Sequence, residues 1–502
     1  MSEIWAQPNQ EQGKRLYLAA QCREIDRTAI EDYGIAGFDL MFRAGQRAFD
    51  HLVETLGSPH DVIVLCGPGN NGGDGYIVAA QALSHGIAVQ LAAVGDPRSA
   101  EAAAARKLFL DAGGVSVALD ELDLAECSKT VIVDALLGTG LQSDPRGDIA
   151  TAIQWINRAG CAVIALDVPS GLNCDTGHAY TPCVDADLTV TFIADKPGLH
   201  TATGVDVVGR VILESLSIPG EIVKSVDPVA RVVSPPSIPK RPQNSHKGRF
   251  GHVVVAGGQP GMLGATVIAG TAALRAGAGL VTILGPGEHL SLAALFQPEL
   301  MSMDASENGK SRALIASADA VVLGPGMGQG DLAHQLAAIC QAASAPLVVD
   351  ADGLNLLAEN PNYMANRILT PHPGEAARLL GTTISDIQTD RFAAAREIVA
   401  RYGGIVVLKG AGTLVWDGES MYLCDRGNPG MAVAGMGDAL SGIIASLAGQ
   451  GIRLAEAARY GVWIHGMAGD QAAEKNGQAG LLPTDVCALL PALMNSIAGP
   501  RT

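Results

Sequence analysis

The chain has 502 residues, 48% of them hydrophobic and 17% charged, so it can bury a large core and is not a disordered protein. Its 34 basic and 51 acidic residues leave a net charge of −17, which disfavours broad binding to the phosphates of nucleic acids. The length predicts roughly two to four domains. The 61 glycines gather behind apolar runs without a triplet period, which excludes collagen and indicates loops that close on ligands.

The sequence also indicates the cellular compartment of the protein. Its first residues lack the basic and then apolar segments of a secretory signal peptide. Nine cysteines without a C-x-x-C pair are typical of free thiols in a reducing cytosol. The stretch 431–451 is apolar, but it contains Asp438 and many small residues, so we expect a buried helix rather than a membrane span. We therefore expect a cytoplasmic protein.

Short β-branched runs alternate with Gly/Pro/Asp loops and with Ala/Leu-rich stretches of helical period. Such an alternation is typical of parallel sheets that are covered by helices on both faces. We expect an α/β protein whose ligands bind at the carboxyl ends of the strands, where the glycine loops lie. The predicted strands span residues 62–65, 131–133, 163–166, 253–256, 321–323, 347–349 and 406–408.

A stretch rich in proline and serine at 234–242 divides the chain and is typical of a semi-rigid linker. We expect a first domain over 1–230, a linker over 231–242 and a second domain over 243–502. Each half is long enough for one α/β domain. The halves do not share motifs, so we expect two different folds in one enzyme.

The first dense motif follows the strand at 62–65. Residues 69–75 hold four glycines, two asparagines and an aspartate, and we expect a helix from about Tyr76. Backbone amides in such a loop can hold an anion beside a helix N-terminus. The alternative is a tight turn that the asparagine side chains cap.

Two further strands of the first half end on an aspartate. Asp134 precedes a Gly-Thr-Gly loop, and Asp167 precedes a Pro-Ser-Gly loop. Either acid alone is at least as consistent with a loop cap as with a site. Together with Asn71 and Ser170 they offer hard oxygen ligands and little positive charge, which favours an alkali or alkaline-earth cation.

The motifs GNNGGDG, DALLGTG and LDVPSGLN make residues 10–215 resemble the N-terminal domain of the bifunctional NAD(P)H-hydrate repair enzymes (YjeF type). The resemblance implies a Rossmann-like, three-layer domain that interconverts the R and S epimers of hydrated NADH and NADPH. It implies K⁺ ligands at Asn71, Asp134 and Ser170, and a catalytic, substrate-binding role for Asp167. The other substrate contacts that it implies are Asn70, Asn71, Gly72, Gly73, Asp74, Gly138, Thr139, Gly140, Leu141, Gln142, Ser143 and Asp144.

The second half opens with a glycine loop and a small-residue helix, which we expect over 265–278. Close helix packing and close approach of a ligand explain these small residues equally well. Further along, His372 lies between two prolines and beside Glu375. A structural histidine is as consistent with this position as a ligand-binding one.

Two later motifs of this half suggest nucleotide chemistry. Lys409 begins a glycine turn, where it can neutralise a phosphate or simply lie in solvent. Asp438 stands at the mouth of an apolar helix that we expect from Ala439. Such an acid is either an ordinary N-cap or a base that accepts the proton of a substrate hydroxyl.

The motifs GGQPGMLGA, GPGMG, DADGLN, TPHPGE, KGAGT and NPGMAVAGMGD make residues 246–495 resemble the dehydratase half of the same repair enzymes. The resemblance implies a ribokinase-like α/β domain that dehydrates the S hydrate at the expense of ADP, with Mg²⁺, giving AMP and phosphate. Asp438 would be the catalytic base. The hydrate would contact Ala265, Gly326, His372 and Asp438, and the adenine nucleotide would contact Lys409, Gly410, Ala411, Gly412, Thr413 and Gly437.

As a whole, the resemblance implies an isomerase and a lyase in one chain, assembled as a homo-oligomer. Its partners would be NADHX, NADPHX (the two hydrates) and an adenine nucleotide, without nucleic acid or membrane. Two alternatives remain at this point. A vitamin or sugar kinase shares the ribokinase-like fold and the G-x-G-D acid, and the first half is also consistent with a non-catalytic binding module.

Overall fold

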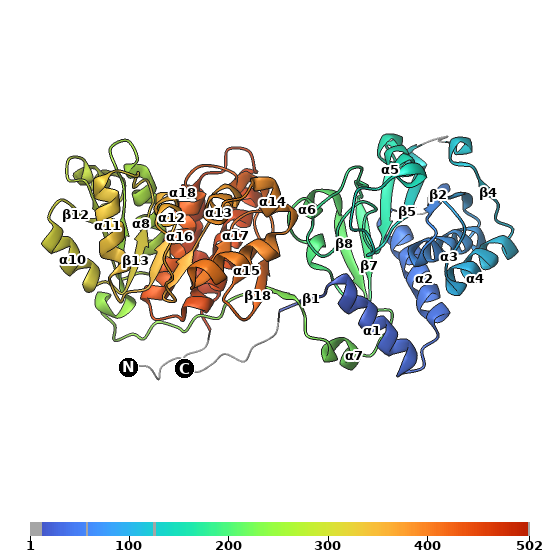
Figure 1. Cartoon of the computed structure of the whole chain (residues 1–502), viewed down its shortest axis with the longest axis horizontal. Helices are drawn as coiled ribbons and strands as arrows, with labels where there is room; N and C mark the ends of the chain where they lie inside the picture. The colour runs from blue at the N-terminus through green and yellow to red at the C-terminus, as the bar shows by residue number, and fades with distance from the viewer. Residues whose placement is uncertain (1–12, 57–58, 124–126, 500–502) are drawn as a thin grey trace. The chain divides into compact units, whose positions relative to one another are not determined.

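The structure, a computed structural model, describes residues 13–56, 59–123 and 127–499. The chain divides into two compact units (Figure 1). The first unit comprises the described residues of Arg15–Ala230, and the second comprises the described residues from Arg231 onward together with Gly13 and Lys14. Each unit contains a largely parallel sheet between helices, which confirms the α/β class.

The first unit is built on seven parallel strands. The strands are β2 (Asp61–Cys66), β3 (Ala88–Ala93), β4 (Ser116–Val117), β5 (Thr130–Ala135), β6 (Ala162–Leu166), β7 (Leu188–Phe192) and β8 (Arg210–Glu214), after a short β1 (Arg15–Leu16). The helices are α1 (Ala19–Glu31), α2 (Gly37–Leu56), α3 (Asn70–Ser84), α4 (Ala100–Asp111), α5 (Gly147–Ala159), α6 (Gly204–Val207) and α7 (Gly220–Ser225).

The strand order of this sheet is β4-β3-β2-β5-β6-β7-β8. Val62 and Val64 of β2 pack among α1, α2, α3 and α4 on one face, whereas Ile63 and Leu65 pack against α5 on the other. Because alternate side chains of a strand point to opposite faces, an uninterrupted apolar strand requires helices on both sides. The three layers confirm the expected Rossmann-like arrangement.

The second unit is built on a longer sheet. Its strands are β9 (Ala230–Val232), β10 (His252–Ala256), β11 (Leu280–Gly285), β12 (Met301–Asp304), β13 (Ala320–Leu323), β14 (Leu347–Val349), β15 (Arg367–Leu369), β16 (Ile405–Leu408), β17 (Thr413–Trp416) and β18 (Met421–Cys424). Its helices are α8 (Leu263–Arg275), α9 (Ala293–Phe296), α10 (Asn308–Ala316), α11 (Asp331–Gln341), α12 (Asp352–Glu359), α13 (Pro373–Leu380), α14 (Ile384–Thr389), α15 (Arg391–Tyr402), α16 (Met436–Gly449), α17 (Leu454–Asn476) and α18 (Pro483–Ser496).

From β12 to β9 the order of this sheet runs β12-β11-β10-β13-β14-β15-β16-β17-β18-β9, and among these strands only β17 is antiparallel to its neighbours. One face is covered by α8, α16, α17 and α18, which share a core with Val253 and Val255 of β10. A side-chain carbon on Gly442 of α16 would collide with the backbone oxygen of Ala269 on α8. Close packing of α8 against α16 therefore explains the glycine at this contact.

The expected boundary region also takes part in this sheet. Arg231 and Val232 of β9 pair in parallel register with Tyr422 and Leu423 of β18, and Val233 is buried. The apolar residues before the proline-rich stretch thus extend the second sheet instead of lying in a solvated linker.

The expectation of free thiols is wrong for one pair of cysteines. Cys127 and Cys161 form a disulfide, whereas the other seven cysteines are free. The two residues precede the paired strands β5 and β6, and their Cα atoms are 4.6 Å apart. Sequence spacing does not reveal this proximity, because it arises from the pairing of two strands that are separated by a helix.

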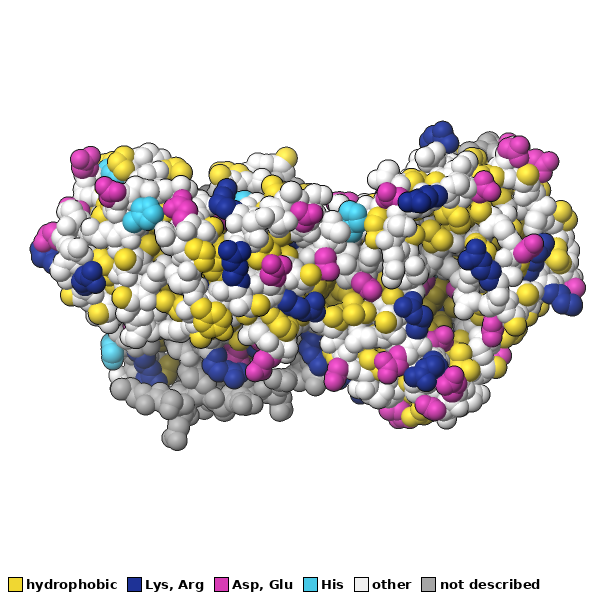
Figure 2. Space-filling view, in the orientation of Figure 1, with side chains coloured by type: hydrophobic (Ala, Val, Ile, Leu, Met, Phe, Trp, Pro, Cys, Tyr) yellow, Lys and Arg dark blue, Asp and Glu magenta, His cyan; other side chains and the backbone are white. Residues whose placement is uncertain are grey.

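Two observations bear on membranes and nucleic acids. Across the described part of the chain, no helix combines the length and the apolarity that a bilayer span requires, and α16 is a buried helix. On the face shown in Figure 2, acidic side chains are interspersed with the basic ones over both units.

Candidate active sites

The first candidate site lies where the strand order of the first unit reverses. The chain runs from β2 outward through β3 and β4, and then returns to place β5 on the other side of β2. The loops after β2 and β5 diverge at this point, which is the usual ligand site of such sheets. A cavity of about 590 Å³ opens there. The expected substrate residues that line it are Asn70, Asn71, Asp74, Gly138, Thr139, Gly140, Leu141 and Asp167.

The glycine motif is helical from Asn70, earlier than the expected start near Tyr76. A side-chain carbon on Gly72 would collide with the backbone oxygen of Gly67, whereas one on Gly73 would meet the end of the Met41 side chain on α2. Glycine allows this first turn to pack tightly against the preceding loop. Gly72 and Gly73 are therefore buried behind the cavity, and the remaining expected contacts, Gln142, Ser143 and Asp144, are exposed beside it.

The three expected cation ligands lie in one hydrogen-bonded cluster around Leu137. Asn71 Nδ2 donates to the Leu137 oxygen at 2.8 Å, and the Leu137 amide donates to Ser170 Oγ at 2.8 Å. Ser170 Oγ in turn donates to Asp134 Oδ1 at 2.6 Å. Asn71 Oδ1 is buried and has no hydrogen-bond partner among the described residues. A buried amide oxygen without a donor is ready to coordinate a cation.

The Asp134 carboxyl is fully buried. Burial raises its pKa to about 6, although hydrogen bonds from Ser170 and from the Leu136 amide act in the opposite direction. A cation beside this carboxyl would compensate its charge, since an adjacent opposite charge favours the ionised form. One carboxylate with neutral amide and hydroxyl oxygens suits K⁺ better than Mg²⁺, which holds its water tightly. The donor set thus fits the cation that the motifs imply.

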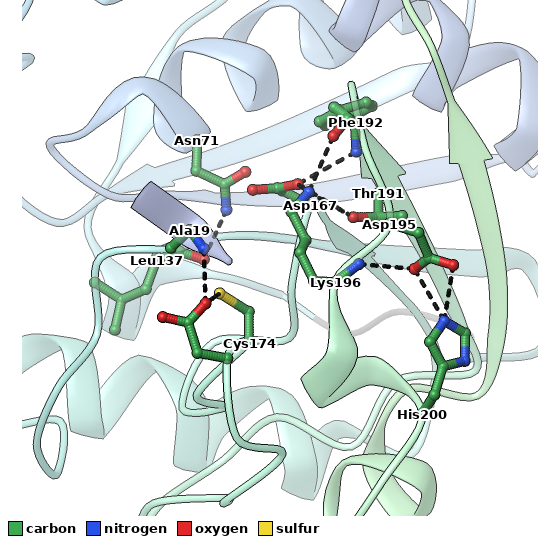
Figure 3. A network of polar contacts seen from close by, with 11 residues as sticks. Ala19, Asn71, Leu137, Asp167, Cys174, Thr191, Phe192, Asp195, Lys196 and His200 are labelled. Carbon is green, nitrogen blue, oxygen red and sulfur yellow. Dashed lines mark hydrogen bonds and ion pairs between the residues drawn. The ribbon is translucent and has the colours of Figure 1, made fainter. Parts of the chain in front are cut away.

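Asp167 lies at the end of β6 and is held by a residue that the motifs did not reveal, Lys196 (Figure 3). Lys196 Nζ donates to Asp167 Oδ1 at 2.5 Å, to Thr191 Oγ1 at 2.7 Å and to the Phe192 oxygen at 3.0 Å. The Lys196 side chain is only 1% exposed. Burial alone would lower the pKa of Lys196, but the Asp167 charge raises it above its ordinary value.

A second carboxyl of the same cavity has a different environment. Asp74 is 8% exposed, and burial raises its pKa well above the ordinary value, with further contributions from the charges of Asp167 and Asp26. Asp167, in contrast, has an ammonium partner in Lys196. The two carboxyls of this cavity therefore differ in their surroundings, because of the two only Asp167 has a cationic partner among the described residues.

The second candidate site lies at the corresponding edge of the other sheet. The chain passes from β10 outward through β11 and β12, and returns to place β13 beside β10. The loops after β14, β15 and β16 gather acids around Lys409. Lys409 Nζ lies 2.8 Å from Asp350 Oδ1 and 3.8 Å from Glu375 Oε2. Burial alone would lower the pKa of Lys409, but Asp350, Glu375 and Asp438 together raise it.

Asp438 belongs to the first turn of α16, where the free backbone N–H groups of the helix lie. Burial raises its pKa to about 7; the charge of Asp350 acts in the same direction, and Lys409 opposes it. A carboxyl that titrates near neutral pH is suited to accept a proton from a substrate. A side-chain carbon on Gly437 would lie 3.0 Å from Lys409 Nζ, so Gly437, Asp438 and Lys409 converge.

The other expected hydrate contacts form two groups. A side-chain carbon on Gly326 would lie 3.3 Å from the Cβ atom of Ala265, so these residues are neighbours. His372 is the N-cap of α13, because its Nδ1 accepts the Gly374 amide at 2.9 Å and its own amide donates to Glu375 Oε2 at 2.7 Å. The capping explains the histidine structurally, while its side chain, 55% exposed, remains accessible to a ligand.

A buried arginine contacts the backbone of the expected nucleotide turn that Lys409 begins. Arg391 Nη2 donates to the Leu408 oxygen at 3.1 Å and to the Lys409 oxygen at 3.3 Å. Thr413 Oγ1 closes the turn by donating to the Gly410 oxygen at 2.9 Å. Ala411 is exposed and Gly412 is half-buried within it.

The sequence motifs did not assign a function to three residues: Lys196, and Asp350 and Glu375 as partners of Lys409. Lys196 is a single lysine 29 residues after Asp167 in the chain, and its only signal is a position in the loop after an apolar strand. Asp350 and Glu375 occur inside recognised motifs, but their contact with Lys409 joins three different loops.

The comparisons with known proteins cover both units. Residues 37–198 match the family described as YjeF-related protein N-terminus, and residues 253–492 match NAD(P)H-hydrate dehydratase. The chain is 43% identical to the bifunctional NAD(P)H-hydrate repair enzyme Nnr of Coxiella burnetii, over 96% of this chain and 99% of that protein. It is 42% identical to the enzyme of that name from Escherichia coli, over 96% and 94%.

Among solved structures, the ADP/ATP-dependent NAD(P)H-hydrate dehydratase from Bacillus subtilis, co-crystallised with ATP and Mg²⁺, is 27% identical with a TM-score of 0.48. The match covers 52% of this chain and 95% of that chain. The likeness to the repair enzymes spans both units, which decides against an isolated vitamin or sugar kinase and against a first half that only binds ligands. The chain therefore belongs to the family of bifunctional NAD(P)H-hydrate repair enzymes.

Proposed function

We propose that this protein repairs hydrated reduced nicotinamide nucleotides in two steps. The first unit interconverts the R and S epimers of NADHX and NADPHX, and the second dehydrates the S epimer to NADH or NADPH with ADP. The observation that carries this proposal is the presence of both sites in a chain that matches bifunctional repair enzymes over nearly its whole length.

The dehydration solves a leaving-group problem. Hydroxide leaves the C6 carbon of the nicotinamide ring slowly, whereas phosphate leaves readily. Asp438 takes the proton of the C6 hydroxyl, and the oxygen attacks the terminal phosphorus of ADP, which releases AMP. The C6–O bond then breaks with loss of a proton from C5, which gives phosphate and restores the ring double bond. The N-terminus of α16 offers N–H groups to the transferring phosphoryl group.

The residues around Lys409 are suited to this transfer. Lys409, in the glycine turn, can contact the nucleotide phosphates, and the adjacent Asp350 and Glu375 hold its ammonium in place. Among the described residues, no group of three or more His, Cys, Asp or Glu is arranged to hold a metal. Mg²⁺ would therefore be held mainly by the phosphate oxygens, as it commonly is in nucleotide enzymes, and would screen their charge.

The epimerase step requires inversion at C6 in the cavity of the first unit. Asp167 acts as the base at the C6 hydroxyl, and the start of α3 with Asn70 and Asp74 holds the hydrate together with the loop of Gly138. K⁺ would be held by Asn71, Asp134 and Ser170, where it would fix the loops after β2, β5 and β6 against one another.

The test follows the absorbance of reduced nicotinamide when the purified protein is mixed with both epimers of NADH hydrate and ADP. We expect complete conversion, with one AMP formed for each NADH. Asp438→Asn should slow NADH formation by about 10²–10⁴-fold, whereas Asp167→Asn should consume the S epimer and then stall at the rate of spontaneous epimerisation. Conversion without ADP or ATP, or a hydrate that remains unchanged with either nucleotide, would overturn the proposal.

Nucleotide preference, location and assembly complete the proposal. ADP is the proposed phosphoryl donor, and parallel assays with ATP compare the two. We propose a cytoplasmic enzyme because its substrates are intracellular metabolites. The proposed homo-oligomer is supported by the exposed apolar side chains of Leu292, Leu295 and Phe296 in the second unit. Sedimentation of the purified chain measures the assembly.

A further inference from the structure

The Lys196 ammonium donates three hydrogen bonds to neighbouring residues. Its three hydrogen-bond acceptors are Asp167 Oδ1, Thr191 Oγ1 and the Phe192 oxygen, all within 3.0 Å. Thr191 and Phe192 are the last residues of β7. Asp167 follows β6, which pairs with β7 in the sheet. The lysine therefore joins the carboxyl ends of two adjacent strands, and its position is determined by the sheet (Figure 3).

The two oxygens of Asp167 have different surroundings. Oδ1 accepts from Lys196 Nζ at 2.5 Å, from the Phe192 amide at 3.2 Å and from Thr191 Oγ1 at 3.3 Å. Oδ2 has no hydrogen-bond donor among the described residues and would lie 3.7 Å from a side-chain carbon on Gly138. Asp167 and Gly138 both line the cavity. One oxygen is thus anchored, and the other faces the space for the substrate.

The backbone of Asp167 is also unusual. Its φ angle is +63°, in the left-handed region that residues other than glycine rarely adopt. Such conformations cost free energy, and they persist where the surrounding structure enforces them, often at functional sites. The hydrogen bonds of Oδ1 with Lys196, Thr191 and Phe192 hold Asp167 in this conformation.

We infer that Lys196 is a positioning residue of the epimerase site, which holds Asp167 as a carboxylate and directs Oδ2 at the C6 hydroxyl of the hydrate. The inference rests on the proposed epimerase function and assigns a role to a residue outside the recognised motifs. The raised pKa of Lys196 agrees with it, because a lysine that stays charged cannot compete for the proton.

The proposed epimerisation returns every proton that it removes. Oδ2 takes the proton of the C6 hydroxyl, the bond between C6 and the ring nitrogen breaks, and C6 becomes an aldehyde while the proton passes to that nitrogen. Rotation about the C5–C6 bond presents the other face of the aldehyde, and the nitrogen adds to it as the proton returns through Oδ2 to the oxygen. No electron, cofactor or net proton is consumed.

The experiment compares Lys196→Met and Lys196→Arg with wild type in the full-length protein. The epimerase is measured with R NADH hydrate, excess dehydratase activity and ADP, over a range of hydrate concentrations that gives kcat and KM separately. Loss of the ammonium should lower kcat by about 10²-fold while KM changes little, because the cation acts on the base and not on the substrate.

Lys196→Arg keeps the charge, so it should retain more of the epimerase kcat than Lys196→Met does. Lys224→Met, the same exchange at an exposed lysine of the same unit, is the matched control and should behave as wild type. Dehydration of the pure S epimer should be unchanged in every variant, which reports on the integrity of the second unit.

A wild-type kcat in Lys196→Met would overturn the inference while leaving the proposed function intact. A wild-type protein without epimerase activity would overturn both. If Lys196→Met does not fold, Lys196→Arg decides, because a loss that appears in KM and not in kcat would contradict the positioning role.

Discussion

A single substitution of Asp438 should change catalytic activity and folding stability in opposite directions. Burial and the neighbouring carboxylates raise its pKa from an ordinary 3.8 to about 7 in the free protein. A shift of this size corresponds to a free energy of about 4 kcal/mol that disfavours the ionised form in the folded state. The folded protein thus holds an acid whose ionisation near neutral pH opposes folding.

Asp438→Asn should therefore lose activity and gain stability. The amide cannot take the hydroxyl proton, so dehydration should fall by about 10²–10⁴-fold. The same amide carries no charge, so the second unit should become more stable than wild type, by an amount that approaches about 4 kcal/mol. Helix α16 remains intact, because asparagine preserves the size of the side chain.

The pH dependence has a defined sign. Below pH 3.8 the carboxyl is protonated in both the folded and the unfolded state, so variant and wild type should have equal stability. As the pH rises, the unfolded state loses the proton first, and the wild type loses stability until the pH passes about 7. The difference between the proteins should grow across this window and then stay constant.

Two measurements check this prediction. Thermal unfolding of both proteins between pH 4 and pH 8, without nucleotide, gives the stability difference, and NADH formation from the pure S epimer gives the rate. For wild type, kcat/KM should rise about tenfold per pH unit below about pH 7 and then level off. A variant that is less stable than wild type at pH 8, or one that dehydrates at a comparable rate, would refute the reasoning.

Three further predictions concern other parts of the chain. Replacing K⁺ by tetramethylammonium, or Asp134 by Asn, should slow epimerisation and leave dehydration of the S epimer unchanged; equal rates with both cations would contradict the site. Asp74→Asn should stabilise the first unit increasingly as the pH rises above about 4, since the buried carboxyl has a raised pKa, and a pH-independent difference in melting temperature would count against this. A fragment beginning at residue 243 lacks β9 and exposes the edge of β18, so it should melt below one beginning at 229; the C-terminal fragment should dehydrate only the S epimer.

Much of the fold follows from local sequence. The β-branched runs at 62–65 and 253–256 are strands because continuous apolar residues are stable between two helical layers, and the structure confirms both. Asp134, Asp167 and Asp438 are recognisable because each ends a strand or opens a helix within a motif, and these positions meet at the carboxyl edges of their sheets.

Other features were decided only by the tertiary structure. Lys196 meets Asp167, and Lys409 meets Asp350, through contacts between separate strand-end loops, so no local pattern predicts them. The proton affinities of the acids likewise depend on burial and on charges brought together by folding. Asp438 has an ordinary carboxyl in the extended chain, and its pKa reaches about 7 only when α16 and the acidic loops surround it.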